Sequence, residues 1–481
     1  MTHVDRIELA PGFTISRVVT GLWQVADMER DGRAIDLEAT ATAMAPFAAA
    51  GFTTFDMADH YGSAEDVAGR FASRAGTGPI ELCTKWVPRP GPVTRDDVRA
   101  AVERALTRLR RDRIDLMQFH AWNYADPSWL DCLFWLDELR TEGLVRHLGL
   151  TNFDTAHLRI VLASGIPVVS NQLCYSLLDQ RAAGRMTALC LERGVKLLAF
   201  GTVAGGLLSD RWLGKPDPDV LDTWSQMKYR RYVGEAGGWD ALQRLLGVLH
   251  AHATRLGVSI ANLACRYMLD QPAVGGIIVG ARLGEAEHIR DNARLFAFEI
   301  DAEARCEIAR VLADLRTIPG DCGDEYRKPP YLTASGDLSH HLDAFPPPYP
   351  VQRRDDRQIA LSGTSWEALA GFSRAVRTGS TIRVSGTTAT HRDGVVGGTD
   401  PAAQAHAIID RIEGAIQSLG GRLADVVRTR VYVRRLEDWE AVARAHGERF
   451  RTIQPANTLV RADLVGDEYL VEMEAEAIVG S

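Results

Sequence analysis

Four polar side chains in the N-terminal part of the chain could together reduce a carbonyl group. Asp56 and Tyr61 stand five residues apart, and Lys85 and His120 follow them. A tyrosine hydroxyl has a pKa of about 10 in water, and a nearby lysine ammonium lowers it by favouring the phenolate. Asp56 can keep Lys85 charged by pairing with it. Tyr61 could then give a proton to a carbonyl oxygen as hydride arrives at the carbon. His120 could donate a hydrogen bond that orients that carbonyl.

Each of these residues also has an ordinary structural explanation when it is taken alone. An aspartate after a strand usually caps a helix or lies in a loop, and a histidine at a strand end is more often a hydrogen-bonded structural residue. Asp56, Lys85 and His120, however, each end a mainly apolar run, where burial without a partner would cost several kcal/mol. We therefore expect the four side chains to meet at one site.

The elements that must position these residues are short apolar strands that alternate with amphipathic helices. Apolar runs occupy residues 18–23, 52–56, 80–85, 114–120, 147–152, 168–172, 195–200 and 275–280. Such runs are typical of strands buried on both faces. Between them, Thr94 and Asp154 stand where they can cap helices. Eight alternating units predict an α/β fold of the (β/α)8 TIM-barrel type, in which reactive residues lie at the carboxyl ends of the strands. An open doubly wound sheet is the alternative.

Aromatic residues near the predicted strand ends could form a substrate pocket. Trp23, Trp86 and Trp122 each lie close to such an end, although each could equally be packing. The gap from residue 200 to residue 275 is too long for one crossover and predicts a long loop with an extra helix, over the barrel mouth or beside it. Aromatic side chains there could close over a substrate. No charged residue is clearly placed to select an acid or a sugar.

Several motifs resemble the aldo-keto reductase family over about residues 8–315. They are FDMADHYGSAE, TKW around Lys85, FHAW around His120, LTNF at 150–153 and NQLCYS at 171–176. The resemblance implies a (β/α)8 barrel, a nicotinamide cofactor, and Asp56, Tyr61, Lys85 and His120 as the catalytic residues. The chain lacks a GxGxxG motif after its first predicted strand, so a Rossmann domain is not indicated.

The same resemblance implies a set of cofactor-binding residues. Asn152 and Gln172 would hold the nicotinamide carboxamide, with Thr151 in place of the more usual serine, and Phe200 would stack on the ring. Gly201 and Val203 replace residues that contact the pyrophosphate. The remaining residues implied are Trp23 at the nicotinamide end and Gly280, Arg282, His288, Asp291 and Asn292 at the adenosine end. Arg282 favours NADPH over NADH because guanidinium matches phosphate; a surface ion pair is its alternative role.

A proline-rich stretch divides the chain into two domains. Residues 329–357 contain six prolines and a charged run, which predicts a stiff linker between domains at 1–328 and 358–481. In the second domain, strands are expected at 381–387, 426–433, 457–463 and 469–477. Helices are expected from Asp400 to Gly420 and over 436–450. This order predicts an α+β domain with helices on one face of the sheet.

The C-terminal domain resembles the Rid (YjgF) family. The matching stretches are IRVSGTTAT, DVVRTRVYV, LEDWEAVARAHGERF, PANTLVRADL and YLVEMEAEA. The resemblance implies a chorismate mutase-like fold, a trimer with clefts between subunits, and hydrolysis of imines or enamines. Asn457 replaces the arginine that clamps a substrate carboxylate and cannot form a bidentate clamp. Glu474 matches the acidic residue that positions water, and Phe372 replaces a tyrosine. We expect imine handling or trimerisation.

Composition narrows the classes of function. The net charge of −8 argues against a nucleic-acid partner, and there is no apolar run of about 18 residues that would cross a membrane. Seven cysteines without a CxxC pair predict reduced thiols, no metal site and a cytoplasmic location. The sequence therefore predicts an NAD(P)H-dependent reductase of a small carbonyl compound that is homo-oligomeric through its Rid-like domain. A dehydrogenase working in the oxidative direction and a non-catalytic cofactor-binding scaffold are the alternatives.

Overall fold

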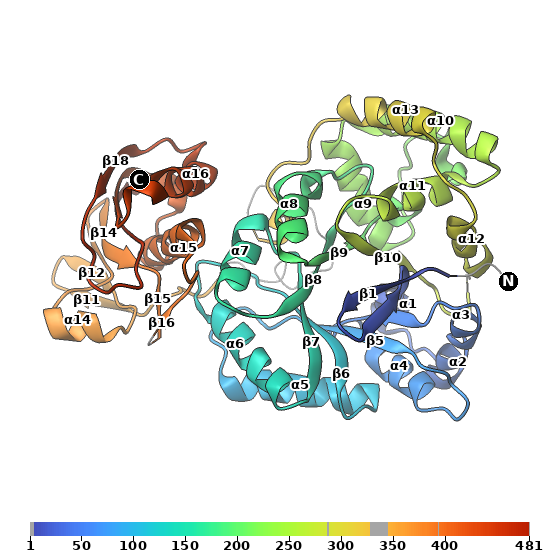
Figure 1. The fold of residues 1–481 in the computed structure, drawn as a ribbon, viewed down its shortest axis with the longest axis horizontal. Coiled ribbons are helices and arrows are strands. Elements are labelled where there is room, and N and C mark those ends of the chain that lie inside the picture. Colours follow the sequence, from blue (N-terminus) through green and yellow to red (C-terminus); the bar gives the residue numbers. More distant parts are fainter. Residues whose placement is uncertain (1–3, 286–287, 328–344, 393, 481) are drawn as a thin grey trace.

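The computed structural model describes residues 4–285, 288–327, 345–392 and 394–480. Eight parallel strands form a closed barrel in the order β10-β3-β4-β5-β6-β7-β8-β9, which confirms the predicted TIM barrel (Figure 1). Each strand coincides with one of the predicted apolar runs. The strands are β3 (Val18–Gly21), β4 (Thr54–Asp56), β5 (Glu81–Trp86), β6 (Ile114–Phe119), β7 (Val145–Thr151), β8 (Val168–Cys174), β9 (Lys196–Phe200) and β10 (Val274–Gly280).

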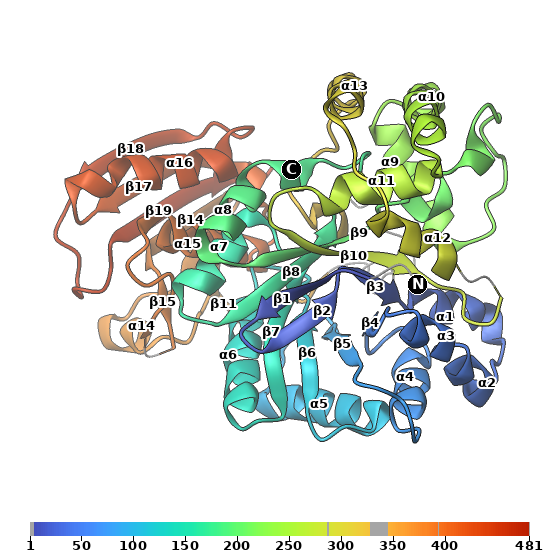
Figure 2. The same ribbon diagram turned by 45° about the vertical axis from the view of Figure 1, so that its right-hand side comes forward.

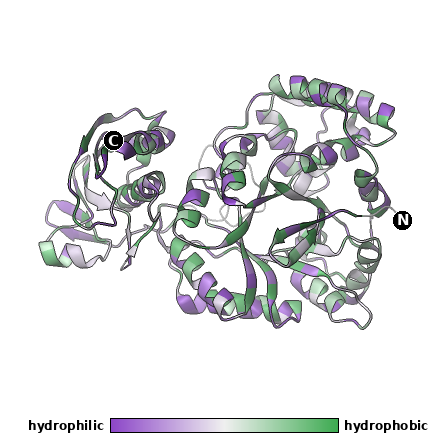
Figure 3. Cartoon of the chain, viewed as in Figure 1, coloured by the Kyte–Doolittle hydropathy of each residue, from purple (hydrophilic) through white to green (hydrophobic). Residues whose placement is uncertain are grey.

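Helices surround the barrel, and two of them begin at the predicted caps. Thr94 caps α5 together with Asp97, and the Asp154 carboxylate accepts the His157 backbone N–H at 2.8 Å at the start of α7. The helices of this part are α1 (Trp23–Met28), α2 (Leu37–Thr42), α3 (Ala45–Ala49), α4 (Ala64–Ala72), α5 (Arg95–Leu109), α6 (Ser128–Thr141), α7 (Thr155–Ala163), α8 (Arg185–Arg193), α9 (Trp224–Glu235), α10 (Trp239–Leu256), α11 (Ile260–Leu269), α12 (Ile289–Ala293) and α13 (Ala302–Ala313). Figure 3 shows the hydrophobic residues concentrated on the barrel strands.

The segment between β9 and β10 differs from the expectation of one extra helix. It contains α9 and α10 in addition to α11, which packs against β10 as a barrel helix does. At the other end of the barrel, a hairpin of β1 (Arg6–Ala10) and β2 (Phe13–Ser16) packs against the strand starts. Ser16 donates its backbone N–H to Thr54 at the first position of β4. The sequence had given no indication of this hairpin.

The C-terminal part is an α+β domain, as predicted. Its sheet has the strand order β11-β12-β13-β14-β19-β17-β18, with α15 packed on β14 and β19. The strands are β11 (Val351–Arg354), β12 (Arg357–Ala360), β13 (Ala375–Thr378), β14 (Thr381–Thr388), β17 (Val426–Val433), β18 (Ala456–Arg461) and β19 (Val471–Ile478). Besides these there are a small ladder of β15 (Thr390–His391) with β16 (Gly394–Val395), and the helices α14 (Ser365–Ala370), α15 (Pro401–Ser418) and α16 (Trp439–Phe450).

The predicted linker extends too far toward the C-terminus. Residues 351–354 form β11 and pair with β12, so the charged run belongs to the sheet rather than to a spacer. An antiparallel edge strand can be exposed and polar, so it need not contain an apolar run that would predict a strand. Residues 329–344 of the predicted linker lie outside the described residues.

The two domains pack directly on each other through α7 of the barrel and α15 of the C-terminal domain (Figures 1 and 2). Gly414 of α15 lies so close to the barrel that a Cβ there would overlap the carbonyl oxygen of Ala125. The described helices include none that is both long enough and apolar enough to cross a bilayer.

Candidate active site

A cavity of about 670 Å³ opens at the carboxyl ends of the barrel strands. It is lined by Asp56, Tyr61, Lys85 and His120, which the structure therefore brings together as the sequence predicted. The predicted cofactor-binding residues that line it are Trp23, Thr151, Asn152, Gln172, Phe200, Gly201, Val203, Gly280, Arg282, His288, Asp291 and Asn292. Its volume lies within the range of about 300–1,000 Å³ that is typical of small-molecule and cofactor sites.

The buried ion pair between Lys85 and Asp56 lines this site. The Lys85 ammonium donates to Asp56 Oδ2 at 2.5 Å and to the Met57 carbonyl at 2.9 Å, and it lies 5.0 Å from the centre of the Tyr61 ring. Burial lowers the pKa of Lys85, but Asp56 and Tyr61 outweigh it and leave this pKa raised. The lysine therefore stays charged beside the Tyr61 ring.

The second oxygen of Asp56 is also fully used. Oδ1 accepts hydrogen bonds from the side-chain amides of Gln118 at 3.0 Å and Gln172 at 2.7 Å. Side chains at these strand ends thus hold the carboxylate from three directions. These three hydrogen bonds fix the carboxylate in place, so Asp56 holds the Lys85 ammonium in one position beside Tyr61.

His120 is buried and neutral. Its Nδ1 lies 3.3 Å from the Thr151 carbonyl, and Nε2 has no hydrogen-bond partner within the described structure. Burial, followed by the charge of Arg327, lowers the pKa of His120 well below its usual value. A carbonyl oxygen only accepts, so Nδ1 carries the proton and Nε2 a lone pair. The expected donation to a carbonyl therefore requires the ring to give up its long bond to Thr151 and take the other tautomer.

Asn152 presents a second buried polar atom without a partner. Its backbone N–H donates to the Gln172 carbonyl at 2.7 Å, and its φ of +59° lies in the left-handed region. Non-glycine residues persist there when the surroundings impose the conformation, often at functional sites. Within the described residues, Oδ1 of Asn152 has no hydrogen-bond partner. An amide N–H₂ group, such as the one on nicotinamide, fits this acceptor.

Aromatic rings form much of the cavity wall, but Trp86 is not one of them. Trp23 packs edge-on against Tyr61 at 4.8 Å between ring centres, and Trp122 against His120 at 4.4 Å. Trp86 is 5% exposed and packs on Phe119 outside the cavity lining. Side chains alternate along a strand, so the residue after Lys85 faces the helix layer, and the expected pocket role of Trp86 does not hold.

Two further residues of the cavity were missed by the sequence. Lys228 of α9 donates to the Tyr326 hydroxyl, and its ammonium lies 4.8 Å from the ring centres of both Tyr326 and Phe200. Tyr326 belongs to the segment after α13, and its ring centre is 5.6 Å from that of His120. Neither follows an apolar strand; the only available signal was the aromatic-rich composition around Lys228.

Arg282, expected at the adenosine end of a bound cofactor, both lines the cavity and forms ion pairs. Its guanidinium contacts Asp27 at 2.8 Å and Glu285 at 2.7 Å. The ion pair that the sequence left open as an alternative role of Arg282 is therefore present, and its role in binding a cofactor phosphate stays a prediction. A cofactor phosphate arriving here would compete with two carboxylates for the same guanidinium.

The predicted cleft residues of the C-terminal domain, Phe372, Asn457 and Glu474, are not brought together within one chain. Glu474 on β19 accepts from Arg430 at 2.8 Å and Tyr432 at 2.9 Å, while Asn457 on β18 accepts from Thr429 at 3.4 Å. Phe372 precedes β13, and β14, β19 and β17 lie between β13 and β18. Strands in a sheet are about 4.8 Å apart, so Phe372 and Asn457 cannot share a ligand in a single copy.

Comparisons with known proteins match the barrel and the C-terminal domain to two different families. The aldo/keto reductase family model matches residues 17–313, and the family model described as endoribonuclease L-PSP matches residues 363–479. Flagellar radial spoke protein 5 of Chlamydomonas reinhardtii is 28% identical over 241 residues, or 42% of this chain and 46% of that protein. The chain thus spans less than half of that relative's length.

Two other similarities cover most of the protein compared. The uncharacterized protein SCO2049 of Streptomyces coelicolor is 38% identical over 121 residues, which are 25% of this chain and 90% of that protein. The glycerol dehydrogenase of Gluconobacter oxydans is 22% identical, covers 66% of this chain and 98% of that chain, and has a TM-score of 0.54, a likeness of fold. Both resemblances predicted from sequence motifs are confirmed, and they support an oxidoreductase function. Since the matched region exceeds half of its length, the chain belongs to the aldo/keto reductase family.

Proposed function

We propose that the protein is an NAD(P)H-dependent reductase of aldehydes or ketones. The observation that carries this proposal is the buried Lys85–Asp56 pair beside Tyr61, in the same cavity as the unpartnered polar atoms of His120 and Asn152. When bound, a reduced nicotinamide supplies hydride to the carbonyl carbon. Asn152, Thr151 and Gln172 would hold its carboxamide, and Phe200 would pack on its ring.

Tyr61 is the proposed proton donor. The Lys85 ammonium stabilises the phenolate that remains after Tyr61 gives its proton to the carbonyl oxygen. Asp56 keeps Lys85 in place because both of its oxygens are engaged. His120 orients the carbonyl once its tautomer places the proton on Nε2, and the 3.3 Å bond to Thr151 that must be given up is a weak one.

The same groups can act in reverse, with the Tyr61 phenolate as base for an alcohol, so a dehydrogenase is the second candidate function.

NADPH is the proposed cofactor because Arg282 lines the cavity. NADH is the alternative cofactor because Asp27 and Glu285 already bind that guanidinium. Comparing KM for NADPH and NADH in the unaltered protein decides between the two cofactors.

For the C-terminal domain we propose assembly in threes rather than hydrolysis. Asn457 lacks a guanidinium, Glu474 is already bonded to Arg430 and Tyr432, and the candidate residues are separated within one chain. A complete cleft would require residues from two copies. Sedimentation equilibrium of the full chain tests the assembly, and a coupled assay of imine hydrolysis tests the activity.

The decisive experiment is turnover of an aldehyde panel, followed by the absorbance of NADPH, for the unaltered protein and Tyr61→Phe. We expect the substitution to reduce turnover by at least about a hundredfold, the lower end of what general acid catalysis contributes. Cofactor binding, measured by quenching of tryptophan fluorescence, should stay the same. Retained turnover would exclude Tyr61 as the acid, and binding without any turnover in the unaltered protein would favour the non-catalytic scaffold.

A further inference from the structure

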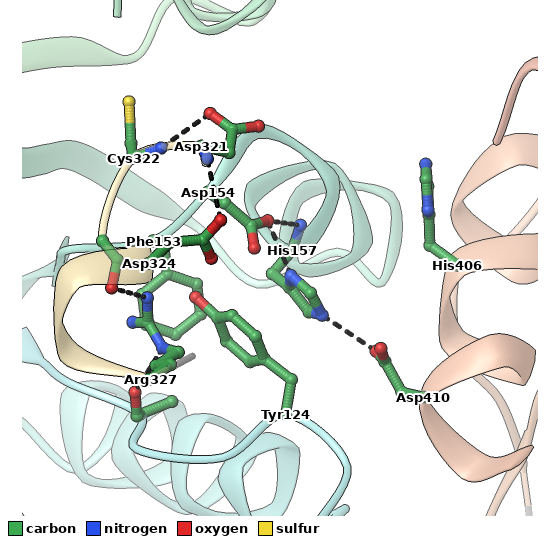
Figure 4. A network of polar contacts seen from close by, with 12 residues as sticks. Tyr124, Phe153, Asp154, His157, Asp321, Cys322, Asp324, Arg327, His406 and Asp410 are labelled. Atoms are coloured by element: carbon green, nitrogen blue, oxygen red, sulfur yellow. Dashed lines mark hydrogen bonds and ion pairs between the residues drawn. The ribbon is translucent and has the colours of Figure 1, made fainter. Parts of the chain in front are cut away.

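The contact between the two domains contains a buried network of charged side chains (Figure 4). His157 of α7 lies between two carboxylates: its Nδ1 is 2.6 Å from Asp154 Oδ1, and its Nε2 is 2.9 Å from Asp410 Oδ2 of α15. The side chains of His157, Asp154 and Asp410 are only 1%, 6% and 7% exposed. Because carboxylate oxygens accept, both ring nitrogens must be protonated, and His157 is a cation that ties the domains together.

On the side of the C-terminal domain, Asp410 is held by a second cation. Arg449 of α16 donates to Asp410 Oδ1 at 2.6 Å and to Glu413 at 2.9 Å. Arg449 is itself buried, with a side-chain exposure of 8%. Asp410 therefore has one oxygen fixed by its own domain and the other directed at His157, which gives it one defined position.

On the barrel side, the chain of contacts continues to the cofactor-binding strand end. Asp154 caps α7 and comes two residues after Asn152, the residue in the left-handed conformation whose Oδ1 faces no partner. A change in the position of the Asp154 carboxylate would move the start of α7 and with it the short turn that carries Asn152. The position of His157 thus bears directly on the geometry of this turn.

A second branch reaches the loop that carries His120. The Tyr124 ring stacks on His157, with 3.3 Å between ring centres and 8° between planes, and the Arg327 guanidinium lies 4.3 Å over the same tyrosine. Arg327 donates to the carbonyl of Ala121 at 2.7 Å, next to His120. Both strand ends that line the cavity on this side are therefore linked to one histidine at the domain contact.

We propose that Asp410, a residue of the C-terminal domain, is a positioning residue for the cofactor site of the barrel, acting through His157 and Asp154. This inference rests on the proposed function insofar as the ligand of that site is a nicotinamide dinucleotide. It gives the covalent linkage of the domains a physical role: the docked C-terminal domain holds the β7–α7 turn in its binding geometry. Removing the Asp410 charge leaves that turn free to adopt other positions, so cofactor affinity should fall.

The structure offers a matched control for generic loosening of the domain contact. His391 of β15 also contacts a carboxylate across this contact, Asp131 of α6, at 2.7 Å. It packs on Phe134 of α6 rather than on the β7–α7 turn. Asp410→Asn and His391→Gln therefore each remove one histidine–carboxylate contact between the domains, but only the first touches the proposed chain. Asp410→Asn also weakens the contact with Arg449 inside the C-terminal domain, which His157→Gln leaves intact.

The test compares the two variants in the full chain. For Asp410→Asn we expect the Kd for NADPH, measured by tryptophan fluorescence, to rise about fivefold or more, a typical size for coupling between sites. KM for the cofactor should rise in parallel while kcat changes little. Backbone amides of residues 152–158 should exchange hydrogen faster without any ligand. His391→Gln should show none of these changes, and Asp410→Glu should restore part of the affinity.

Equal effects of Asp410→Asn and His391→Gln, or no effect of either, would overturn the proposal. His157→Gln, which cannot bridge both carboxylates, repeats the test from the barrel side should Asp410→Asn fail to fold. Failure of the proposed function has a different signature: the unaltered protein would then neither bind NADPH or NADH nor turn over any aldehyde. The hydrogen exchange at residues 152–158 would still report on the positioning role.

Discussion

The barrel mouth and the open sheet of the C-terminal domain each contain a cation paired with a carboxylate, but in different surroundings. Lys85 and Asp56 are each 4% exposed, whereas Arg430 and Glu474 are 34% and 30% exposed. Water and salt screen the second pair, so it contributes little to stability. Removing one partner of the first leaves an uncompensated buried charge. The two pairs contain similar residue types and differ in burial. Burial therefore distinguishes the candidate catalytic pair Lys85–Asp56 from the surface pair Arg430–Glu474.

Replacing the cation of each pair by methionine tests this difference most strongly. Lys85→Met should lower turnover by at least about a hundredfold, because Tyr61 then loses the charge that stabilises its phenolate. Arg430→Met should leave turnover unchanged. Circular dichroism on both variants checks that the fold survives. A barrel that keeps its activity without Lys85 would remove the distinction between the two pairs.

A smaller effect is expected at the cation that the sequence did not reveal. Lys228 lines the cavity, and none of the ion pairs among the described residues involves it. Its charge should favour substrates that carry a carboxylate. Lys228→Met is expected to raise KM about tenfold, the equivalent of about 1.4 kcal/mol, for 4-carboxybenzaldehyde but not for benzaldehyde. Lys228→Arg serves as the control, and equal changes for both aldehydes would contradict this role.

The smallest effect concerns pH and the contact between the two regions. Burial lowers the pKa of His157, but Asp154 and Asp410 outweigh it, so the pKa in the folded protein is raised. The stability that His157 contributes is therefore complete below its unfolded pKa of about 6.5 and is lost as pH rises through the folded value. The difference in unfolding temperature between the unaltered protein and His157→Gln should be largest near pH 6 and narrow at alkaline pH. A difference that does not change with pH would contradict the assignment of a charged ring.

The barrel was predictable because its strands are buried on both faces. Eight apolar runs gave the strands, and the polar residues that end those runs, such as Lys85 and His120, converge on one cavity because parallel strands end at the same rim. Periodicity along a single strand also accounts for the error at Trp86, which lies one position beyond Lys85 and so on the opposite face. Taking the alternation into account would have prevented that error.

Other features depend on contacts between distant parts of the chain. Lys228 and Tyr326 meet from an insertion and from the segment after α13, and Asp410 meets His157 across 253 positions of the sequence. The exposed strand β11 has no apolar pattern, and the first hairpin is short. The spacing of residues along the sequence does not predict these contacts, because they form only when elements distant in the sequence pack together.

Gly414 allows the two domains to approach each other more closely than any other residue at this position would. Its missing side chain lets α15 rest directly on the carbonyl of Ala125, so even one methyl group would act as a wedge. Rotation of one domain relative to the other would first require α15 to separate from the barrel at Ala125. The two domains should therefore tumble in solution as one rigid body.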